Sequence, residues 1–360
     1  MACSICFNSH TISRLDATSC TDMGMKWKKK DGKALYEGRP VTDMCHVPAS
    51  EPITVQKRGA AFHEMLSILP DCMLASHLRH AQAAMTQAGP PRAGEELLFR
   101  TIVGNSMQLD ADLVQDLEPV GVSGALATLY DRYCVGESGS LSILKEFQGS
   151  PRWATEREKR ITGSTCYGLY TYAKNRGVEP EEWQGKLSTM AKPFRGNQAT
   201  SYGKRCEKLA LSLYSESVQD SSAQVVQCGL VVPPNCPWIG VSPDAILFKD
   251  GKPHRLVEIK SPTAGAKLSA SELLTQGKTQ YVVFDGENGY LKPRHPYYGQ
   301  VQLGMAVLTV SACDFVVYGK ESLAIIKVPR DDAFISDMLR VLHSVFFRVM
   351  LPFHAAKLVQ

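Results

Sequence analysis

The chain has 360 residues, of which 44% are hydrophobic and 21% charged, and its formal net charge is +4. This length suffices for one large core and a smaller module, so we expect about two domains in an ordinary globular protein. The charge is too small to indicate a nucleic-acid partner by itself.

Two features of the sequence bear on the cellular compartment. No run of about eighteen apolar residues occurs, and the opening MACSICFNSHTISRLD lacks the basic and then apolar layout of a signal peptide. The eleven cysteines are odd in number and irregularly spaced, which favours free thiols in a reducing compartment. We therefore expect an intracellular protein with no membrane partner and no structural disulfides; a nuclear location would follow if DNA is the substrate.

Residues 1–58 are polar and irregular, and we predict a basic arm or linker there. The lysines around Trp27 form either a solvated face or a DNA contact. Zinc binding is an alternative interpretation, because thiolates and imidazoles are preferred zinc ligands, although the later ligands lack a tight C-x-x-C spacing. The lysines are Lys26, Lys28, Lys29 and Lys30, and the candidate zinc ligands are Cys3, Cys6, Cys20, Cys45 and His46.

The hydrophobic pattern divides the rest of the chain. Residues 59–148 repeat apolar positions at helical spacing, which predicts a helical N-terminal region. Gly, Ser and Pro gather at 136–140 and 149–151 and indicate a boundary near residue 148. Residues 149–360 mix both periods, so we predict an α/β domain in which helices flank a small central mixed sheet. The expected strands cover residues 238–248, 255–260, 315–318 and 324–328, and a closing helix covers 331–351.

One predicted strand contains the strongest candidate for chemistry. Side chains alternate between the two faces of a strand, so Glu258 and Lys260 in the segment RLVEIK point the same way. Asp244 opens the preceding strand, and a tight turn at Asp250 and Gly251 would fold the two strands side by side. We therefore expect Asp244 to approach Glu258.

Two carboxylates beside a lysine suit metal-assisted hydrolysis. Carboxylate oxygens bind Mg²⁺ or Mn²⁺, which lowers the pKa of a bound water, and Lys260 could orient or deprotonate that water. The alternative is that Glu258 and Lys260 are an exposed pair on a surface strand. Glu207 lies at the edge of an apolar helical stripe through Cys206, Leu209, Ala210 and Leu213, so it points either inward or to solvent.

Five blocks occur in a fixed order: WATEREKRITGS, YGKRCE, SPD, VEIKSP and YYGQVQ. This ordered set resembles the phage lambda exonuclease and YqaJ viral recombinase family of PD-(D/E)XK nucleases, over about residues 150–355. The resemblance implies a restriction-endonuclease-like core. It also implies that Asp244, Glu258 and the backbone carbonyl of Ile259 bind metal, with two ions in the site. Lys260 would activate the water, and Gln300 would orient the lysine and the water.

The same resemblance assigns roles to residues outside the strand pair. Glu207 matches a helical acid that assists the second metal position. Arg157, Ser164 and Ser242 match a pocket for a 5′-terminal phosphate, for which an arginine fork and two hydroxyls are suitable donors. Taken singly, these three are also compatible with a solvated charge, a helix cap and a turn residue. Gln302 is expected to face away from the site.

The sequence thus predicts a Mg²⁺-dependent DNA nuclease, specifically a 5′-to-3′ exonuclease on double-stranded ends that acts in recombination or repair. Its expected partner is duplex DNA with free ends, and a homotrimer is implied by the resemblance alone. The alternative is an inactive DNA-binding or partner-docking protein that retains the nuclease fold. A third interpretation is a structural α/β domain with surface charge pairs.

Overall fold

The computed structural model describes residues 93–109, 122–190, 198–218 and 220–359. The chain divides into two compact units, Met1–Gly89 and Pro90–Gln360, and every described residue belongs to the second. The predicted basic arm, its candidate zinc ligands and the predicted helices before residue 93 lie outside the described residues. The boundary that we expect near residue 148 stays a prediction.

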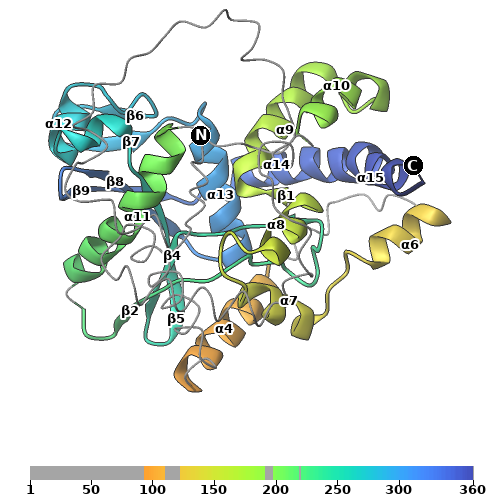
Figure 1. The fold of residues 1–360 in the computed structure, drawn as a ribbon, viewed down its shortest axis with the longest axis horizontal. Coiled ribbons are helices and arrows are strands. Elements are labelled where there is room, and N and C mark those ends of the chain that lie inside the picture. The colour runs from red at the N-terminus through yellow and green to blue at the C-terminus, as the bar shows by residue number, and fades with distance from the viewer. Residues whose placement is uncertain (1–92, 110–121, 191–197, 219, 360) are drawn as a thin grey trace, which may run out of the picture. The chain divides into compact units, whose positions relative to one another are not determined.

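Helices and strands alternate through the second half of this unit (Figure 1). The described helices are α4 (Ala93–Ser106), α6 (Ala125–Asp131), α7 (Glu137–Leu144), α8 (Pro151–Glu158), α9 (Gly163–Arg176), α10 (Pro180–Met190), α11 (Gln198–Ser217), α12 (Ala270–Thr275), α13 (Pro296–Leu308), α14 (Asp332–Val345) and α15 (Leu351–Val359). The described strands are β1 (Ile161–Thr162), β2 (Ala223–Val226), β3 (Ile239–Gly240), β4 (Ala245–Lys249), β5 (Lys252–Lys260), β6 (Val282–Phe284), β7 (Gly289–Leu291), β8 (Ala312–Gly319) and β9 (Ser322–Pro329). Short helical turns lie at Thr263–Ala266 and Phe346–Met350.

The central sheet has five strands in the order β2-β4-β5-β8-β9. β5 occupies the middle, where it pairs with β4 in antiparallel and with β8 in parallel orientation. The β4–β5 hairpin turns at Asp250 and Gly251, both with positive φ, as expected for a tight two-residue hairpin turn. The predicted α/β class, with helices flanking a small central mixed sheet, is confirmed.

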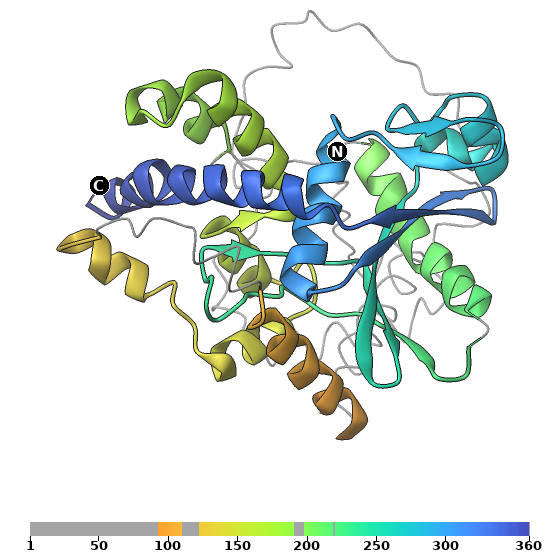
Figure 2. The same ribbon diagram turned by 180° about the vertical axis from the view of Figure 1, so that it is seen from behind.

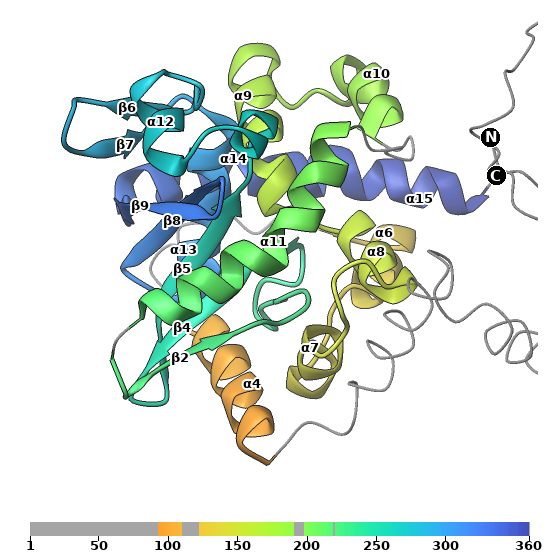
Figure 3. The same cartoon turned by 60° about the vertical axis from the view of Figure 1, so that its left-hand side comes forward.

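Helices cover both faces of this sheet. α11 lies over one face, where Cys206, Ala210 and Tyr214 pack against the odd-numbered β5 residues Val257 and Ile259 (Figures 1 and 3). α13 and α4 lie on the opposite face, seen from behind in Figure 2, beside the larger apolar core that contains Leu256. Because β5 is central and covered on both faces, its residues Leu256, Val257, Glu258 and Ile259 are buried whichever way they point, whereas Lys252 and His254 at its start are exposed.

The predicted strand at 238–248 is wrong as a single element. It divides into β3 and β4, and the residues Ser242, Pro243 and Asp244 between them have no strand conformation. Pro243 has no backbone N–H and cannot complete a ladder, which accounts for the interruption. The break frees the neighbouring Ser242 and Asp244 from the sheet.

The predicted closing helix ends too early. α14 continues through a π-helical turn at Phe346–Met350 into α15, which ends at Val359. Aromatic packing maintains this turn, since Phe346 and Phe347 contact Trp238 and Tyr130. The apolar period alone did not reveal that the helix extends past residue 351.

Six described cysteines are free thiols, and five of them are buried: Cys166, Cys206, Cys228, Cys236 and Cys313, with Cys134 exposed. Within the described ranges, no helix has the length and apolar character needed to cross a membrane.

Candidate active site

Strand β5 brings Glu258 and Lys260 onto the face covered by α13. Glu258 is 3% exposed, and its Oε1 lies 2.5 Å from the Nζ of Lys260. The side chain of Lys260 is 19% exposed, so this ion pair is largely shielded from water. The exposed surface pair considered as an alternative is therefore not what the fold produces.

Asp244 joins this pair through the backbone of β5. It stands directly before β4, whose first residue, Ala245, is paired with Val257. Its Oδ2 accepts a hydrogen bond of 2.6 Å from the N–H of Ile259. Burial, and after it the negative charge of Glu258, raises the pKa of Asp244 well above its usual range, as expected for two carboxylates that share one site.

Helix α13 supplies two further contacts to the β5 pair. The Nε2 of Gln300 donates to Glu258 Oε1 at 2.6 Å, so this oxygen accepts from both Gln300 and Lys260. The Nζ of Lys260 also lies 4.4 Å from the centre of the Tyr297 ring, a cation–π distance. Sequence reasoning missed Tyr297, although its position one helical turn before Gln300 could have indicated it.

Gln302 faces away from the site, as predicted. It is fully buried, and its amide joins α13 to the end of β9 by donating to the carbonyl of Pro329 and accepting from the N–H of Asp331, both at 2.9 Å. Its role is therefore structural.

Glu207 on α11 approaches from the other face of the sheet. Burial, followed by the charge of Glu258, raises its pKa, while Lys260 acts in the opposite direction, so its carboxyl shares an electrostatic environment with the β5 pair. The apolar stripe that we expected beside it is corrected in one place: Leu209 is 59% exposed, and Tyr214 takes its place in the core. Cys206, Ala210 and Tyr214 recur every four residues and leave Glu207 at the edge of the stripe.

Lys260 is an ammonium in this state of the site. Burial alone would lower the pKa of Lys260, but the carboxylates of Glu258 and Asp244 outweigh this effect and raise it above its ordinary value. A lysine with a raised pKa donates hydrogen bonds and cannot accept a proton at neutral pH. Base catalysis by Lys260 would require those carboxylate charges to be neutralised first.

The three predicted phosphate-pocket residues converge. Arg157 on α8 donates to Ser242 Oγ at 3.2 Å and to Ser164 Oγ at 3.0 Å. They line one cavity of about 50 Å³, whose wall also includes Glu258 and Gln300. Burial lowers the pKa of the Arg157 guanidinium, and the negative charge of Glu258 acts against this effect. We call this cavity the Arg157 pocket.

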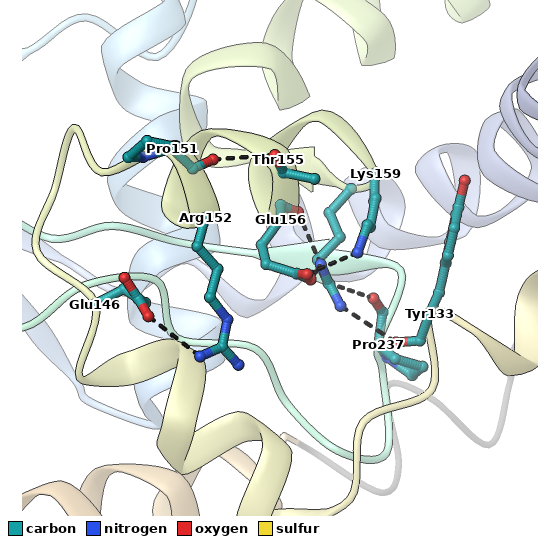
Figure 4. Close-up of polar contacts among 9 residues, drawn as sticks. Tyr133, Glu146, Pro151, Arg152, Thr155, Glu156, Lys159 and Pro237 are labelled. Atoms are coloured by element: carbon teal, nitrogen blue, oxygen red, sulfur yellow. Dashed lines mark hydrogen bonds and ion pairs between the residues drawn. The ribbon is translucent and has the colours of Figure 1, made fainter. Parts of the chain in front are cut away.

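A buried arginine fixes the helix that carries Arg157. Arg160 is 2% exposed and donates to the backbone carbonyls of Glu156, Pro237 and Tyr133 at 2.7, 2.9 and 3.2 Å. Figure 4 shows Glu156, Pro237 and Tyr133 converging beside α8, with Lys159 paired to the same glutamate at 2.6 Å. Three separate segments of the chain are thereby joined at the end of α8.

The donor set suits a Mg²⁺ or Mn²⁺ ion. Among the described residues, no group of three or more Asp, Glu, His or Cys side chains forms a ready-made cage. Mg²⁺ does not need one, because it is commonly held by one or two carboxylates together with waters and phosphate oxygens. A divalent cation would relieve the repulsion between the carboxylates of Asp244 and Glu258. The expected third ligand, the backbone carbonyl of Ile259, belongs to the residue that follows Glu258.

Comparisons with known proteins agree with the family expected from the five blocks. The model of the YqaJ-like viral recombinase domain matches residues 152–311. No curated protein sequence matches the chain.

Among solved structures, the chain is similar to an alkaline exonuclease from Laribacter hongkongensis, at 23% identity and a TM-score of 0.42, over 58% of this chain and 96% of that one. It is similar to a phage-related exonuclease from Haemophilus somnus, at 14% identity and a TM-score of 0.37, over 54% and 96%. The shutoff and exonuclease protein of the Kaposi's sarcoma-associated herpesvirus is also similar, at 14% identity and a TM-score of 0.36, over 65% and 74%.

Proposed function

We propose that the YqaJ-like viral recombinase domain at residues 152–311 is a metal-dependent deoxyribonuclease that digests duplex DNA from its 5′ ends. The observation that carries this proposal is the convergence of Asp244 before β4, of Glu258 and Lys260 on β5, and of Gln300 on α13. Each has the residue type that phosphodiester hydrolysis requires. Recombination or repair is the setting that we propose for this activity.

Different residues have different proposed roles in hydrolysis. When bound between Asp244 and Glu258, Mg²⁺ or Mn²⁺ would polarise the scissile phosphate and acidify a water. Lys260 holds a positive charge where negative charge develops on the phosphate, a contribution worth about 3–4 kcal/mol in comparable sites. Gln300 restrains Glu258 by a hydrogen bond, and the ring of Tyr297 restrains Lys260.

The Arg157 pocket supports attack at a DNA end. A 5′-terminal phosphate fits an arginine fork with two hydroxyls, and the same cavity is walled by Glu258 and Gln300. A phosphate held there would place the next phosphodiester beside the catalytic carboxylates. Glu207, which approaches from the face of the sheet covered by α11, is proposed to assist a second metal ion. The trimer implied by the resemblance stays a prediction.

The decisive experiment measures digestion of linear duplex DNA in Mg²⁺ by the wild type, Asp244→Ala and Lys260→Ala. We expect both variants to lose at least about 100-fold in rate, because each removes charge stabilisation from the reaction centre. Asp220→Ala and Lys249→Ala are matched controls, since this exposed ion pair of 2.8 Å has the same residue types and lies outside the Arg157 pocket.

The outcomes separate the proposed functions. Activity that survives in both site variants would reject the site, whereas a folded wild type that binds duplex DNA without cutting it would favour the inactive DNA-binding protein. Faster digestion of 5′-phosphorylated than of 5′-hydroxyl ends is expected from the Arg157 pocket.

A further inference from the structure

Trp153 stands next to the Arg157 pocket without lining it. It lies one helical turn before Arg157 on α8, so the two side chains share a face of that helix. One side of the indole packs against the small apolar cluster of Ile143, Leu230 and Val232. The ring is therefore anchored in the fold, and its N–H points to a fixed place.

The indole N–H of Trp153 points to the hydroxyl of Ser242. The Trp153 Nε1–H donates to Ser242 Oγ at 3.0 Å, and Arg157 donates to the same oxygen at 3.2 Å. Indole and guanidinium groups can only donate, and a serine oxygen has two lone pairs. Both acceptor positions of Ser242 are thus filled, and its one O–H hydrogen must point away from these two donors.

No residue in the described part of the chain accepts that hydrogen in a hydrogen bond, and Ser242 lines the Arg157 pocket. The Ser242 hydroxyl can therefore donate its hydrogen to a bound anion, which can only accept hydrogen bonds. Without the indole N–H, Ser242 could rotate and donate elsewhere, because a free hydroxyl rotor adapts to whatever acceptor is near.

Trp153 also restrains the arginine. The guanidinium carbon of Arg157 lies 4.4 Å from the centre of the indole ring. Stacking on an aromatic face fixes the plane of the guanidinium, and the bonds to Ser242 and Ser164 fix its rotation within that plane. Only two of its five N–H donors are used by these serines, which leaves donors for a bound phosphate.

We propose that Trp153 is a positioning residue for end recognition: it sets Arg157 and Ser242 as preoriented donors to a 5′-terminal phosphate. The inference rests on the proposed function, to which it adds the residue that sets the geometry of the pocket. Trp153 touches neither the phosphate nor the reacting atoms in this assignment, and it acts through its two neighbours.

The test uses Trp153→Phe, which keeps an aromatic ring under Arg157 and removes the indole N–H. Initial rates are measured on duplexes with 5′-phosphate and 5′-hydroxyl ends. Binding of the same duplexes is measured by fluorescence anisotropy in a Lys260→Ala background, so that the result does not depend on turnover. We expect the preference for the 5′-phosphate to fall by about 3- to 10-fold, mainly through KM, with little change on 5′-hydroxyl ends.

Trp183→Phe is the matched control. Trp183 is fully buried, and its Nε1–H also makes one hydrogen bond of 3.0 Å, to the carbonyl of Gly177; neither residue lines the Arg157 pocket. It should lower stability and leave the end preference intact. The double variant Trp153→Phe with Ser242→Ala should be no worse than Ser242→Ala alone, because both remove the same oriented donor.

The other possible results contradict either the role of Trp153 or the phosphate pocket itself. A wild type that prefers 5′-phosphate ends beside a Trp153→Phe variant with the same preference would overturn the role of Trp153 and leave the proposed function standing. Equal losses on both kinds of end, or additive losses in the double variant, would also overturn it. Equal binding of both ends by the wild-type pocket would reject the phosphate pocket together with this inference.

Discussion

Glu258 and Lys260 owe their significance to burial. An exposed pair of this kind contributes little to stability, whereas here the glutamate is 3% exposed and its Oε1 accepts two hydrogen bonds. Removing a carboxylate from water is costly unless its oxygens are well paired, and Lys260 and Gln300 provide that pairing. The arrangement keeps both charges largely shielded from solvent.

Two glutamines on α13 allow catalysis and stability to be separated. Gln300→Ala removes one donor to Glu258, so we expect the DNA digestion rate to fall about 10-fold with a small change in melting temperature. Both quantities are measured on the same preparation, by initial rates and by thermal denaturation.

Gln302→Ala is the matched comparison. It leaves the backbone groups of Pro329 and Asp331 without their buried partners, so we expect loss of about 1–3 kcal/mol of stability with a nearly unchanged rate per folded molecule. The reverse pattern, a stable but inactive Gln302→Ala beside an active Gln300→Ala, would contradict the assignment of the two side chains.

At the scale of elements, α9 and α13 hold the two halves of the site together. Ser164 of the Arg157 pocket is on α9, and Gln300 is on α13. The helices approach closely because both contain glycine at the contact: a Cβ on Gly299 would lie 2.8 Å from Tyr167 Cβ, and one on Gly163 would lie 3.3 Å from Gln300 Cγ. The packing of α9 against α13 thus positions Ser164 of the Arg157 pocket relative to Gln300, which donates to Glu258.

Gly299→Ala tests this packing. We expect a loss of about 1–3 kcal/mol, because the new methyl group meets the rigid base of the Tyr167 side chain, and a lower nuclease rate as α9 shifts. Gly168→Ala on α9 is the control: outside the neighbouring backbone of its own helix, no atom lies within 4 Å of its Cβ position, so removal of a helical glycine should stabilise by about 0.5–1 kcal/mol. Denaturant titration measures both, and equal stability of the two variants would argue against the close contact.

For the whole molecule, the two carboxylates of Asp244 and Glu258 should lower the free energy of unfolding, although nuclease activity requires them. Burial and the nearby charge of Glu258 both disfavour the ionised form of Asp244, so Asp244→Asn should raise the melting temperature without metal by about 2–4 °C, while it abolishes nuclease activity. The asparagine oxygen can still accept from the N–H of Ile259. Mg²⁺ should raise the melting temperature of the wild type and leave that of the variant unchanged, because binding to the folded state alone stabilises it.

Asp314, a buried and well-paired aspartate, is the control for this prediction. It is 3% exposed, accepts a hydrogen bond from Tyr214 at 2.7 Å and pairs with Arg255 at 3.3 Å. Asp314→Asn should therefore lower the melting temperature. If Asp244→Asn lowered it as well, repulsion between the carboxylates would not be the dominant effect.

Local sequence determined the parts of this protein that depend on neighbouring residues. Period-two alternation placed Glu258 and Lys260 on one face, and the Asp250-Gly251 turn aligned β4 with β5, because both effects act over a few bonds. The order of the five blocks predicted a resemblance to the YqaJ family, and the model of the YqaJ-like viral recombinase domain matches residues 152–311. The break at Pro243 was open to the same local reasoning and was missed.

Only the tertiary structure decided which distant side chains meet. Trp153 and Ser242 are 89 residues apart, and Gln300 and Glu258 are 42 apart, so no periodicity links them. The contact of Tyr297 with Lys260 and the exposure of Leu209 likewise depend on how each helix is rotated against the sheet. That rotation is set by packing across the whole core, where glycines permit close approach and apolar stripes compete for burial.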